Sequence, residues 1–290
     1  MDNTIQGTGV ALVTPFLDNG KVDYKSLEDL VDYVICNGVD FVLALGTTSE
    51  AATMSQEEKE EVLNTIIKQT AKRVPVVMGL GGNNTSAIVE DINTRDFKGI
   101  DAILTVAPYY NKPNQAGLIA HFSAIAEACP IPVILYNVPG RTSSNISADT
   151  VISLAKKFDN IVAVKEASAD FDQIMQIIKH KPENFKVLSG DDALTFPLMS
   201  IGMEGVISVV ANVWPEQMSR LISESVKGNY DDAKEIHYKM LDLTNALFAE
   251  GNPSGVKAAL LSKKVISRDC LRLPLIPVSN ALRAEIESNL

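Results

Sequence analysis

The sequence predicts an α/β fold, a closed (β/α)8 TIM barrel with an appended C-terminal helical region. Short apolar runs alternate with amphipathic segments along most of the chain. The runs are apolar throughout, which is typical of parallel strands buried on both faces. About eight such units follow one another at a spacing of roughly thirty residues, which fits an eight-stranded barrel.

The eight apolar runs are the predicted strands. They cover Gly9–Thr14, Phe41–Leu45, Pro75–Gly79, Ala102–Val106, Val133–Tyr136, Ile161–Lys165, Lys186–Leu188 and Gly205–Ser208. Each run is short and is followed by polar or turn-forming residues, as expected for barrel strands that end in loops.

The segments between the strands are predicted helices. Apolar residues recur at helical spacing over Leu27–Ile35, as in a helix that packs one face on a core. Ser55 is followed three residues later by Glu58, the signature of a capping box at a helix start. The remaining predicted helices are Asn84–Phe97, Pro113–Cys129, Ser147–Phe158, Phe171–His180, Asp192–Ile201 and Pro215–Lys227.

The strand pattern stops near residue 229. Helical patterns follow over Asp231–Ala249, Gly255–Lys263 and Ser279–Asn289. We therefore expect the barrel to occupy residues 1–228 and the C-terminal helical region residues 229–290, with no linker that would separate independent domains.

An open doubly wound sheet is the alternative fold. A Gly-rich dinucleotide loop after the first strand would favour it, but the chain reads Thr14-Pro15-Phe16 there. Gly79–Gly82 follows a strand, yet it lacks the G-x-G-x-x-G spacing of a cofactor loop. The closed barrel remains the prediction.

Composition narrows the function classes. A net charge of −10 disfavours a nucleic-acid or anionic-membrane partner, because both require clustered Lys and Arg. No apolar stretch approaches the length of a membrane span. The three cysteines and three histidines show no metal-ligand spacing, so we expect no metal and a cytoplasmic protein.

Lys165 is the most informative residue, because it ends the apolar run Ile161–Val164. A lysine that emerges from a buried strand is poorly solvated, and desolvation lowers its pKa. A partly neutral amine is a nucleophile toward carbonyls and can form a Schiff base. The alternative is a lysine that ends the strand and reaches water.

Other strand ends carry polar groups, and barrel enzymes place their chemistry at those ends. Tyr136 ends the strand before that of Lys165, so the two side chains can approach for proton transfer. The Gly46–Ser49 stretch can offer N–H groups and hydroxyls to a carboxylate, or can simply cap the next helix. Arg141 can bind a carboxylate with both guanidinium arms, or can lie in solvent. Asp191-Asp192 is typical of a helix N-terminus and disfavours a phosphate-bearing substrate.

Five motifs along the chain are GTTSE at 46–50, APYYNKP at 107–113, YNVPGRT at 136–142, VKEAS at 164–168 and LSGDDA at 188–193. In this order and spacing the chain resembles the 4-hydroxy-tetrahydrodipicolinate synthase (dihydrodipicolinate synthase) family. That family belongs to the pyruvate-dependent class I aldolase group, which also contains N-acetylneuraminate lyase. The resemblance covers essentially the whole chain, the helical tail included.

The resemblance implies a lyase that condenses pyruvate with L-aspartate 4-semialdehyde to give 4-hydroxy-2,3,4,5-tetrahydrodipicolinate, on the route to lysine and diaminopimelate. No metal or organic cofactor is implied. Lys165 matches the lysine that condenses with pyruvate, and Tyr136 matches the tyrosine that moves protons. Thr47 and Tyr110 match the other hydroxyls of the proton relay, with Tyr110 supplied by a neighbouring subunit.

The resemblance also implies substrate-binding residues and an assembly. Thr48 matches the site of the pyruvate carboxylate, and Arg141 matches the residue that meets the carboxylate of the semialdehyde. Gly190 and Ile207 match positions whose backbone carbonyls line the site. Members of the family are usually homotetramers built as dimers of dimers, and dimers are also known.

Two departures from the family pattern stand out. Ser49 replaces the glycine usual in the GTTGE loop, and a serine would add strain there if the position requires a positive φ. Lysine-inhibited members carry histidines where this chain has Gln56 and Lys59. A cation at that place repels the ammonium group of lysine, so we expect weak or absent inhibition by lysine.

Two rival functions share part of this evidence. A sister aldolase that cleaves sialic acid or a keto-deoxy sugar acid would keep Lys165, Tyr136 and the GTT loop, but would favour hydroxyl and amide groups in place of Arg141. A catalytically silent barrel that binds a keto acid as a sensor is the second rival.

Overall fold

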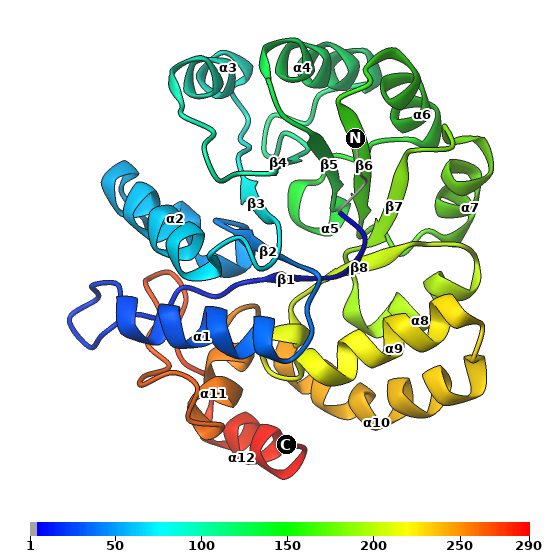
Figure 1. Ribbon diagram of the computed structural model, residues 1–290. Helices are drawn as coiled ribbons and strands as arrows, with labels where there is room; N and C mark the ends of the chain where they lie inside the picture. The colour runs from blue at the N-terminus through cyan, green and yellow to red at the C-terminus, as the bar shows by residue number, and fades with distance from the viewer. Residues whose placement is uncertain (1–4) are drawn as a thin grey trace.

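A computed structural model describes residues 5–290, and it is a closed barrel of parallel strands (Figure 1). The strands pair in sequence order, and the last closes on the first. Their bounds are β1 Gly7–Ala11, β2 Phe41–Ala44, β3 Val76–Gly79, β4 Ala102–Val106, β5 Val133–Asn137, β6 Ile161–Glu166, β7 Lys186–Ser189 and β8 Gly205–Ser208. The predicted TIM barrel is confirmed, and the first four residues of its expected range lie outside the described part of the chain.

The first strand is the one whose predicted position was wrong. It begins at Gly7, which pairs with Gly205 of β8, and it ends at Ala11 rather than at Thr14. Leu12 N–H still donates to Leu43 O of β2 at 3.1 Å, but Val13 N–H donates to a side chain, Asn212 Oδ1, at 3.2 Å. Apolar composition alone does not distinguish such a side-chain partner from a neighbouring strand.

The barrel interior is filled by alternate strand residues. Phe41 and Leu43 of β2 belong to the same buried cluster as Ile134 of β5 and Ala163 of β6. Gly9 of β1 lies opposite Phe41, and a Cβ at Gly9 would lie 2.2 Å from the Phe41 ring. Glycine is therefore required where that ring fills the barrel. Lys165 and Tyr136 follow Ala163 and Ile134 by two residues, so they continue the inward-facing rows.

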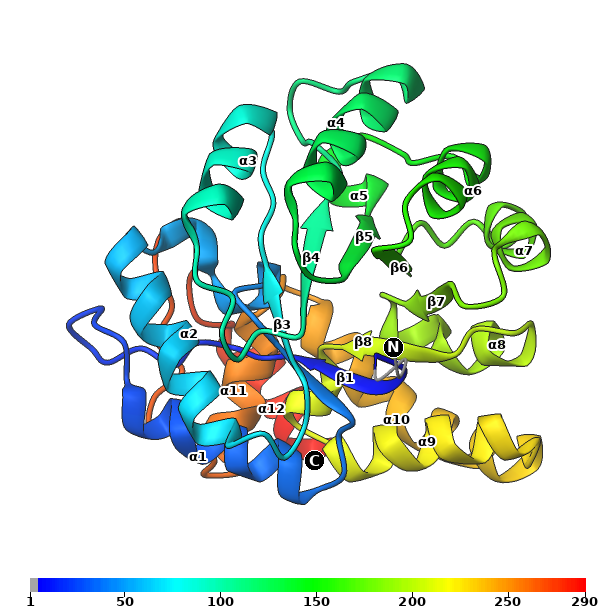
Figure 2. The ribbon, with the colours of Figure 1, turned by 45° about the horizontal axis from the view of Figure 1, so that its top comes forward.

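Helices surround the barrel (Figure 2). They are α1 Tyr24–Cys36, α2 Gln56–Thr70, α3 Thr85–Thr94, α4 Gln115–Ala128, α6 Ala148–Lys157, α7 Phe171–His180, α8 Thr195–Ser200 and α9 Pro215–Lys227. The predicted capping box at α2 is confirmed: Glu58 N–H donates to Ser55 Oγ at 3.2 Å and Ser55 N–H to Glu58 Oε2 at 3.0 Å. The segment 192–201 divides into a 3-10 turn, η3 Asp192–Leu194, and α8.

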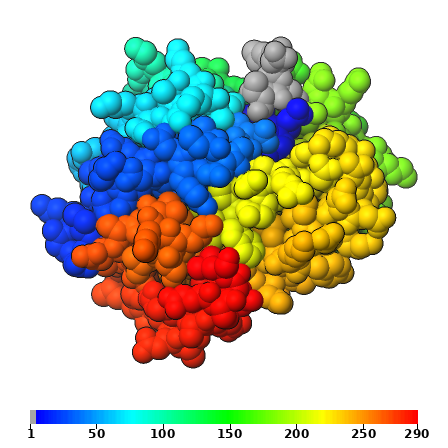
Figure 3. Space-filling model, turned by 60° about the horizontal axis from the view of Figure 1, so that its bottom comes forward, coloured from blue at the N-terminus to red at the C-terminus, as the bar shows by residue number. Residues whose placement is uncertain are grey.

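The chain continues into α10 Tyr230–Phe248, α11 Ser254–Ser262 and α12 Asn280–Ser288. Helix α10 packs on α9 and α11, and α12 packs on α11. A Cβ at Gly255 would lie 2.4 Å from the carbonyl oxygen of Leu247, so α10 and α11 approach closely only because this residue is glycine. Figure 3 shows the orange and red C-terminal residues against the blue N-terminal part of the chain. Within residues 5–290, none of the helices has the length and apolar character needed to cross a membrane.

Candidate active site

A cavity of about 370 Å³ lies at the C-terminal ends of the strands. Its lining includes Thr47, Tyr136, Lys165 and Gly190, each at or just after the end of a different strand. The C-terminal region contributes a wall through residues of α10 and through Asn252. The loops of four strands and one helix beyond the barrel therefore meet around a single lysine.

Lys165 is buried, with 5% of its surface exposed. Its ammonium lies over the Tyr136 ring, 4.4 Å from the ring centroid. Burial lowers the pKa of Lys165 to about 8, while the charge of Asp192 raises it and that of Arg141 lowers it further. The lowered pKa expected from the sequence is confirmed, and the alternative in which the ammonium reaches water is wrong. At pH 7 about one amine in ten is then neutral.

Tyr136 is the direct neighbour of Lys165 across the barrel wall, because β5 and β6 pair in register at these two residues. Burial raises the pKa of Tyr136 to about 12, against the smaller lowering effect of Arg141. The phenol therefore keeps its proton at neutral pH and can donate it. This is the property required of a group that returns protons to an intermediate on the lysine.

Asp192 is the carboxylate whose negative charge raises the pKa of Lys165. Its carboxylate is buried, accepts a hydrogen bond from Val209 N–H at 2.9 Å, and accepts another from the Ser208 hydroxyl. Burial raises the pKa of Asp192 to about 6. The sequence placed both Asp191 and Asp192 at a helix N-terminus, but only Asp191 caps the turn, by accepting from Leu194 N–H. The role of Asp192 was missed, although a buried lysine itself signals a nearby carboxylate.

The segment after β2 forms two short 3-10 turns, η1 Thr47–Ser49 and η2 Ala51–Thr53. Thr47 is exposed toward the cavity, and Thr48 is buried and accepts a hydrogen bond from Asn252 Nδ2 at 2.9 Å. Ser49 has no positive φ, and its hydroxyl donates to Gly46 O at 2.7 Å. The strain that a positive φ would have caused at Ser49 is therefore absent. Between Gly46 and Thr53 the left-handed residue is Glu50, at φ 58°.

Arg141 lies on the short helix α5 (Pro139–Thr142), where it is exposed. It lines both the cavity of Lys165 and an adjoining cavity of about 530 Å³. Gly190 lies against the lysine stem, because a Cβ there would be 2.9 Å from Lys165 Cε. Ile207 fills the barrel interior and is not among the cavity-lining residues, whereas Val209 two residues later is.

The two tyrosines after β4 lie outside the Lys165 cavity. Tyr110 is 89% exposed and lines neither cavity. Tyr109 lines the adjoining cavity together with Gln56 and Lys59. Within this chain Tyr110 is therefore not brought to Lys165, and its supply by a neighbouring subunit stays a prediction.

Glu166 is a buried carboxylate that organises the loops beside Lys165. It accepts hydrogen bonds from Asn137 Nδ2 at 3.1 Å, Ser168 N–H at 2.9 Å and Gln173 Nε2 at 3.2 Å. Burial raises the pKa of Glu166, and these donors oppose that rise. Glu50, in the segment after β2, likewise accepts a hydrogen bond from a backbone N–H, that of Arg272, at 2.9 Å. Among residues 5–290 no His, Cys, Asp and Glu cluster could hold a metal ion.

Comparison with known proteins places these features in one family. The model of the dihydrodipicolinate synthetase family matches residues 4–290. A protein of Parabacteroides distasonis named 4-hydroxy-tetrahydrodipicolinate synthase is 48% identical over 276 residues, which cover 95% of this chain and 93% of that one.

Solved structures of similar proteins superpose on this chain over nearly its whole length. Dihydrodipicolinate synthase from Aquifex aeolicus is 43% identical, with a TM-score of 0.94 over 98% of this chain and 96% of that one. The enzyme from Acinetobacter baumannii, described as chloride inhibited and complexed with pyruvate, is also 43% identical, with a TM-score of 0.94 over 99% and 98% of the two chains. With the buried lysine, its tyrosine and the strand-end loops all in place, the chain belongs to the dihydrodipicolinate synthetase family.

Proposed function

We propose that this chain is a lyase that condenses pyruvate with L-aspartate 4-semialdehyde to give 4-hydroxy-2,3,4,5-tetrahydrodipicolinate, an intermediate on the route to lysine and diaminopimelate. The observation that carries the proposal is the buried Lys165 amine, whose pKa is lowered to about 8 and whose nitrogen faces the Tyr136 ring and the cavity. The similar proteins named 4-hydroxy-tetrahydrodipicolinate synthase support the choice of reaction.

The first half of the reaction activates pyruvate. The neutral amine of Lys165 attacks the ketone carbon, a C–N bond forms, and the ketone oxygen leaves as water. The resulting iminium withdraws electrons from the methyl group, which loses a proton and becomes an enamine. Because the iminium accepts these electrons, the reaction requires no metal or organic cofactor.

Proton transfers are assigned to the hydroxyls near the lysine. Tyr136 keeps its phenolic proton at neutral pH, since burial raises its pKa to about 12. Thr47 lines the same cavity and is assigned the next position in the relay. Tyr110 is assigned the third position, supplied by a second copy of the chain, because it is 89% exposed on its own subunit.

The two substrates are held by different groups. Thr48 and the N–H groups of its turn receive the pyruvate carboxylate, and Arg141 receives the carboxylate of the semialdehyde. The enamine carbon adds to the aldehyde, forming a C–C bond and a hydroxyl. The amino group of the semialdehyde then attacks the iminium carbon, closes the ring and releases Lys165. The Gly190 backbone carbonyl is assigned to the site wall, whereas Ile207 fills the barrel interior and does not line the cavity.

A homotetramer built from dimers is the proposed assembly, with a dimer as the smaller form that still supplies Tyr110. The proposed location is the cytoplasm, which suits an enzyme of amino-acid biosynthesis. A sister aldolase acting on a sugar acid is less favoured, because Arg141 stands at the cavity where a polyol would call for hydroxyl and amide partners.

Two measurements test the proposal. Borohydride reduction in the presence of pyruvate should leave a pyruvyl-derived mass on the peptide that contains Lys165, and none without pyruvate. A coupled assay should show turnover with pyruvate and aspartate semialdehyde and none with N-acetylneuraminate. A trapped adduct without turnover of the semialdehyde would instead favour a sister aldolase, and no adduct would leave only a keto-acid binder.

A further inference from the structure

A second lysine, Lys257 of α11, is fully buried on the far side of the Thr47–Glu50 turn. Its ammonium donates to Glu50 Oε1 at 2.5 Å and to Cys270 O at 2.8 Å, and it lies 4.3 Å from the centroid of the Phe16 ring. Both members of the ion pair have side chains with no exposed surface. A buried charge pair costs much of its own attraction in lost solvation, so stability alone is a weak reason for it.

Glu50 is the residue between the two turns after β2, Thr47–Ser49 and Ala51–Thr53, which we call the catalytic turn. It has φ 58°, where a side chain is unfavourable unless its surroundings hold it. It ends the turn that begins at Thr47, since Glu50 N–H donates to Thr47 O at 3.2 Å. It also starts the next turn, because its carbonyl oxygen accepts from Thr53 N–H at 2.9 Å. Holding the Glu50 side chain therefore holds the residues that line the cavity.

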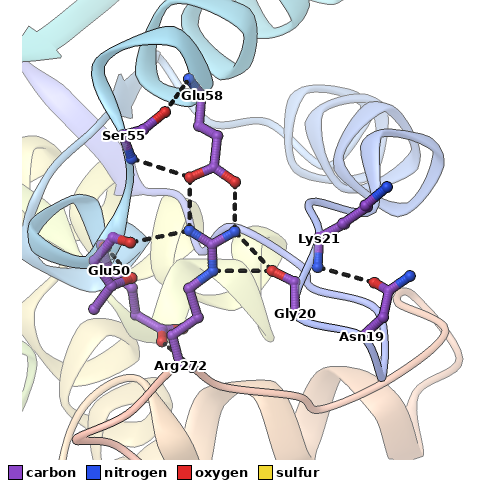
Figure 4. A network of polar contacts seen from close by, with 8 residues as sticks. Asn19, Gly20, Lys21, Glu50, Ser55, Glu58 and Arg272 are labelled. Carbon is purple, nitrogen blue, oxygen red and sulfur yellow. Dashed lines mark hydrogen bonds and ion pairs between the residues drawn. The ribbon is translucent and has the colours of Figure 1, made fainter.

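Residues of the C-terminal region form further hydrogen bonds with this segment. Glu50 Oε2 accepts from Arg272 N–H, so both carboxylate oxygens are bound by residues beyond the barrel. The Arg272 guanidinium lies between the carbonyl of Gly20 and the carboxylate of Glu58, which in turn bonds Ser55 (Figure 4). Asn252 donates to the hydroxyl of Thr48. Apart from the contact to Gly20, these contacts converge on the segment that runs from Thr47 to the start of α2.

We propose that Lys257 is a positioning residue for the reaction: its ammonium holds the Glu50 carboxylate and thereby sets the turn that presents Thr47 and Thr48 to pyruvate. This inference rests on the proposed function. Lys257 does not touch the cavity and acts only through Glu50. An apolar pair at positions 50 and 257 could fill the same space, but it would not fix the direction of the side chain at position 50.

The chain offers a matched control in Lys181, at the opposite end of the barrel. Its ammonium also donates to a glutamate, Glu204 Oε1 at 2.9 Å, and to a backbone carbonyl, Phe185 O at 2.6 Å. Glu204 lies just before β8 and bonds the first part of β7, away from the cavity. Both Lys257→Met and Lys181→Met thus remove a lysine that joins a glutamate and a carbonyl, and only the first can move the catalytic turn.

The experiment compares pyruvate kinetics of the two variants well below the melting temperature of each. For Lys257→Met we expect kcat/KM for pyruvate to fall on the order of 100-fold, mainly through KM, as for a misplaced binding group. The rate of borohydride trapping at saturating pyruvate should stay near wild type, because Lys165 is unmoved. Lys181→Met should lose thermal stability while its pyruvate kinetics stay within about twofold of wild type.

Glu50→Gln provides a second test in case Lys257→Met does not fold. It keeps the shape of the side chain and removes its charge, so it should raise the pyruvate KM in the same direction. The double variant should be no worse than the more impaired single variant, because both changes break one contact. Wild-type pyruvate kinetics in a folded Lys257→Met or Glu50→Gln protein, or an equal defect in Lys181→Met, would overturn the inference. A wild-type protein without a Lys165 adduct would instead overturn the proposed function.

Discussion

The two lysines Lys165 and Lys257 are both buried, but the groups that contact their ammonium nitrogens differ. Burial lowers the pKa of both amines. Lys257 is held by a carboxylate and a carbonyl, whereas no carboxylate within residues 5–290 lies at ion-pair distance from Lys165. Lys165 instead faces an aromatic ring and a cavity. A buried lysine is available for chemistry when its partners leave the nitrogen lone pair accessible, and it is structural when they surround the ammonium.

The largest effect is expected from removing Lys165. Lys165→Ala should lower kcat by on the order of 10⁴-fold or more, because it removes the atom that forms the covalent intermediate. Borohydride trapping of pyruvate should vanish, while circular dichroism and melting temperature stay close to wild type. A Lys165→Ala protein with substantial turnover would show that the comparison is wrong at its centre.

The next largest effect is expected from crowding the Lys165 stem. In Gly190→Ala the new methyl group would lie 2.9 Å from Lys165 Cε and 2.8 Å from Ala167 Cβ, so the amine must shift. A displacement of this kind should lower kcat/KM for pyruvate by about 100-fold. Gly140→Ala is the control, since a Cβ there meets no atom within 4 Å and φ is not positive. If both variants behave like wild type, the position of the lysine stem is not critical.

The pH dependence of pyruvate capture should report the open lysine. Only the neutral amine attacks, so kcat/KM for pyruvate should rise about tenfold per pH unit below the Lys165 pKa of about 8 and level off above it. The Asp192 carboxylate favours the charged ammonium and raises that pKa. Asp192→Asn should therefore move the acidic limb of the profile to lower pH.

A surface substitution supplies the reference for that shift. Asp149→Asn, in the exposed first turn of α6, should leave the profile unchanged. An acidic limb that stays in place in Asp192→Asn would mean that Asp192 does not set the protonation of Lys165.

The sequence predicted the open lysine far better than the enclosed one. Lys165 and Tyr136 stand out in the sequence because both end apolar runs, and the structure decides between a buried amine and one that reaches water. Lys257 lies in an ordinary helical segment, and Glu50 is 207 positions away along the chain. Nothing local signals such a pair, since the contact exists only after the C-terminal helices have packed beside the barrel.

The same reason explains the other differences. The early end of β1 depends on Asn212, which is 199 residues from Val13. The conformation of Ser49 depends on where the loop places its left-handed residue, and that residue is Glu50. Periodicity and local motifs thus predict the barrel and the groups at its strand ends. Contacts that join distant segments, and the division at residues 228 and 229, require the folded chain or a direct test.

The smallest expected effect concerns the adjoining cavity, where Lys59 stands with Gln56, Tyr109 and Arg95. Arg95 is ion-paired with Glu60 and Asp91, so Lys59 adds positive charge to that lining. Free L-lysine, whose ammonium groups this charge repels, should leave the rate unchanged over a titration to about millimolar concentration. Lys59→Gln tests the cause, because removing the cation should increase any sensitivity to lysine. Inhibition of the wild-type protein at micromolar lysine would show that the charge of Lys59 does not prevent lysine from binding in this cavity. The difference between Lys165 and Lys257 would then say nothing about the role of Lys59.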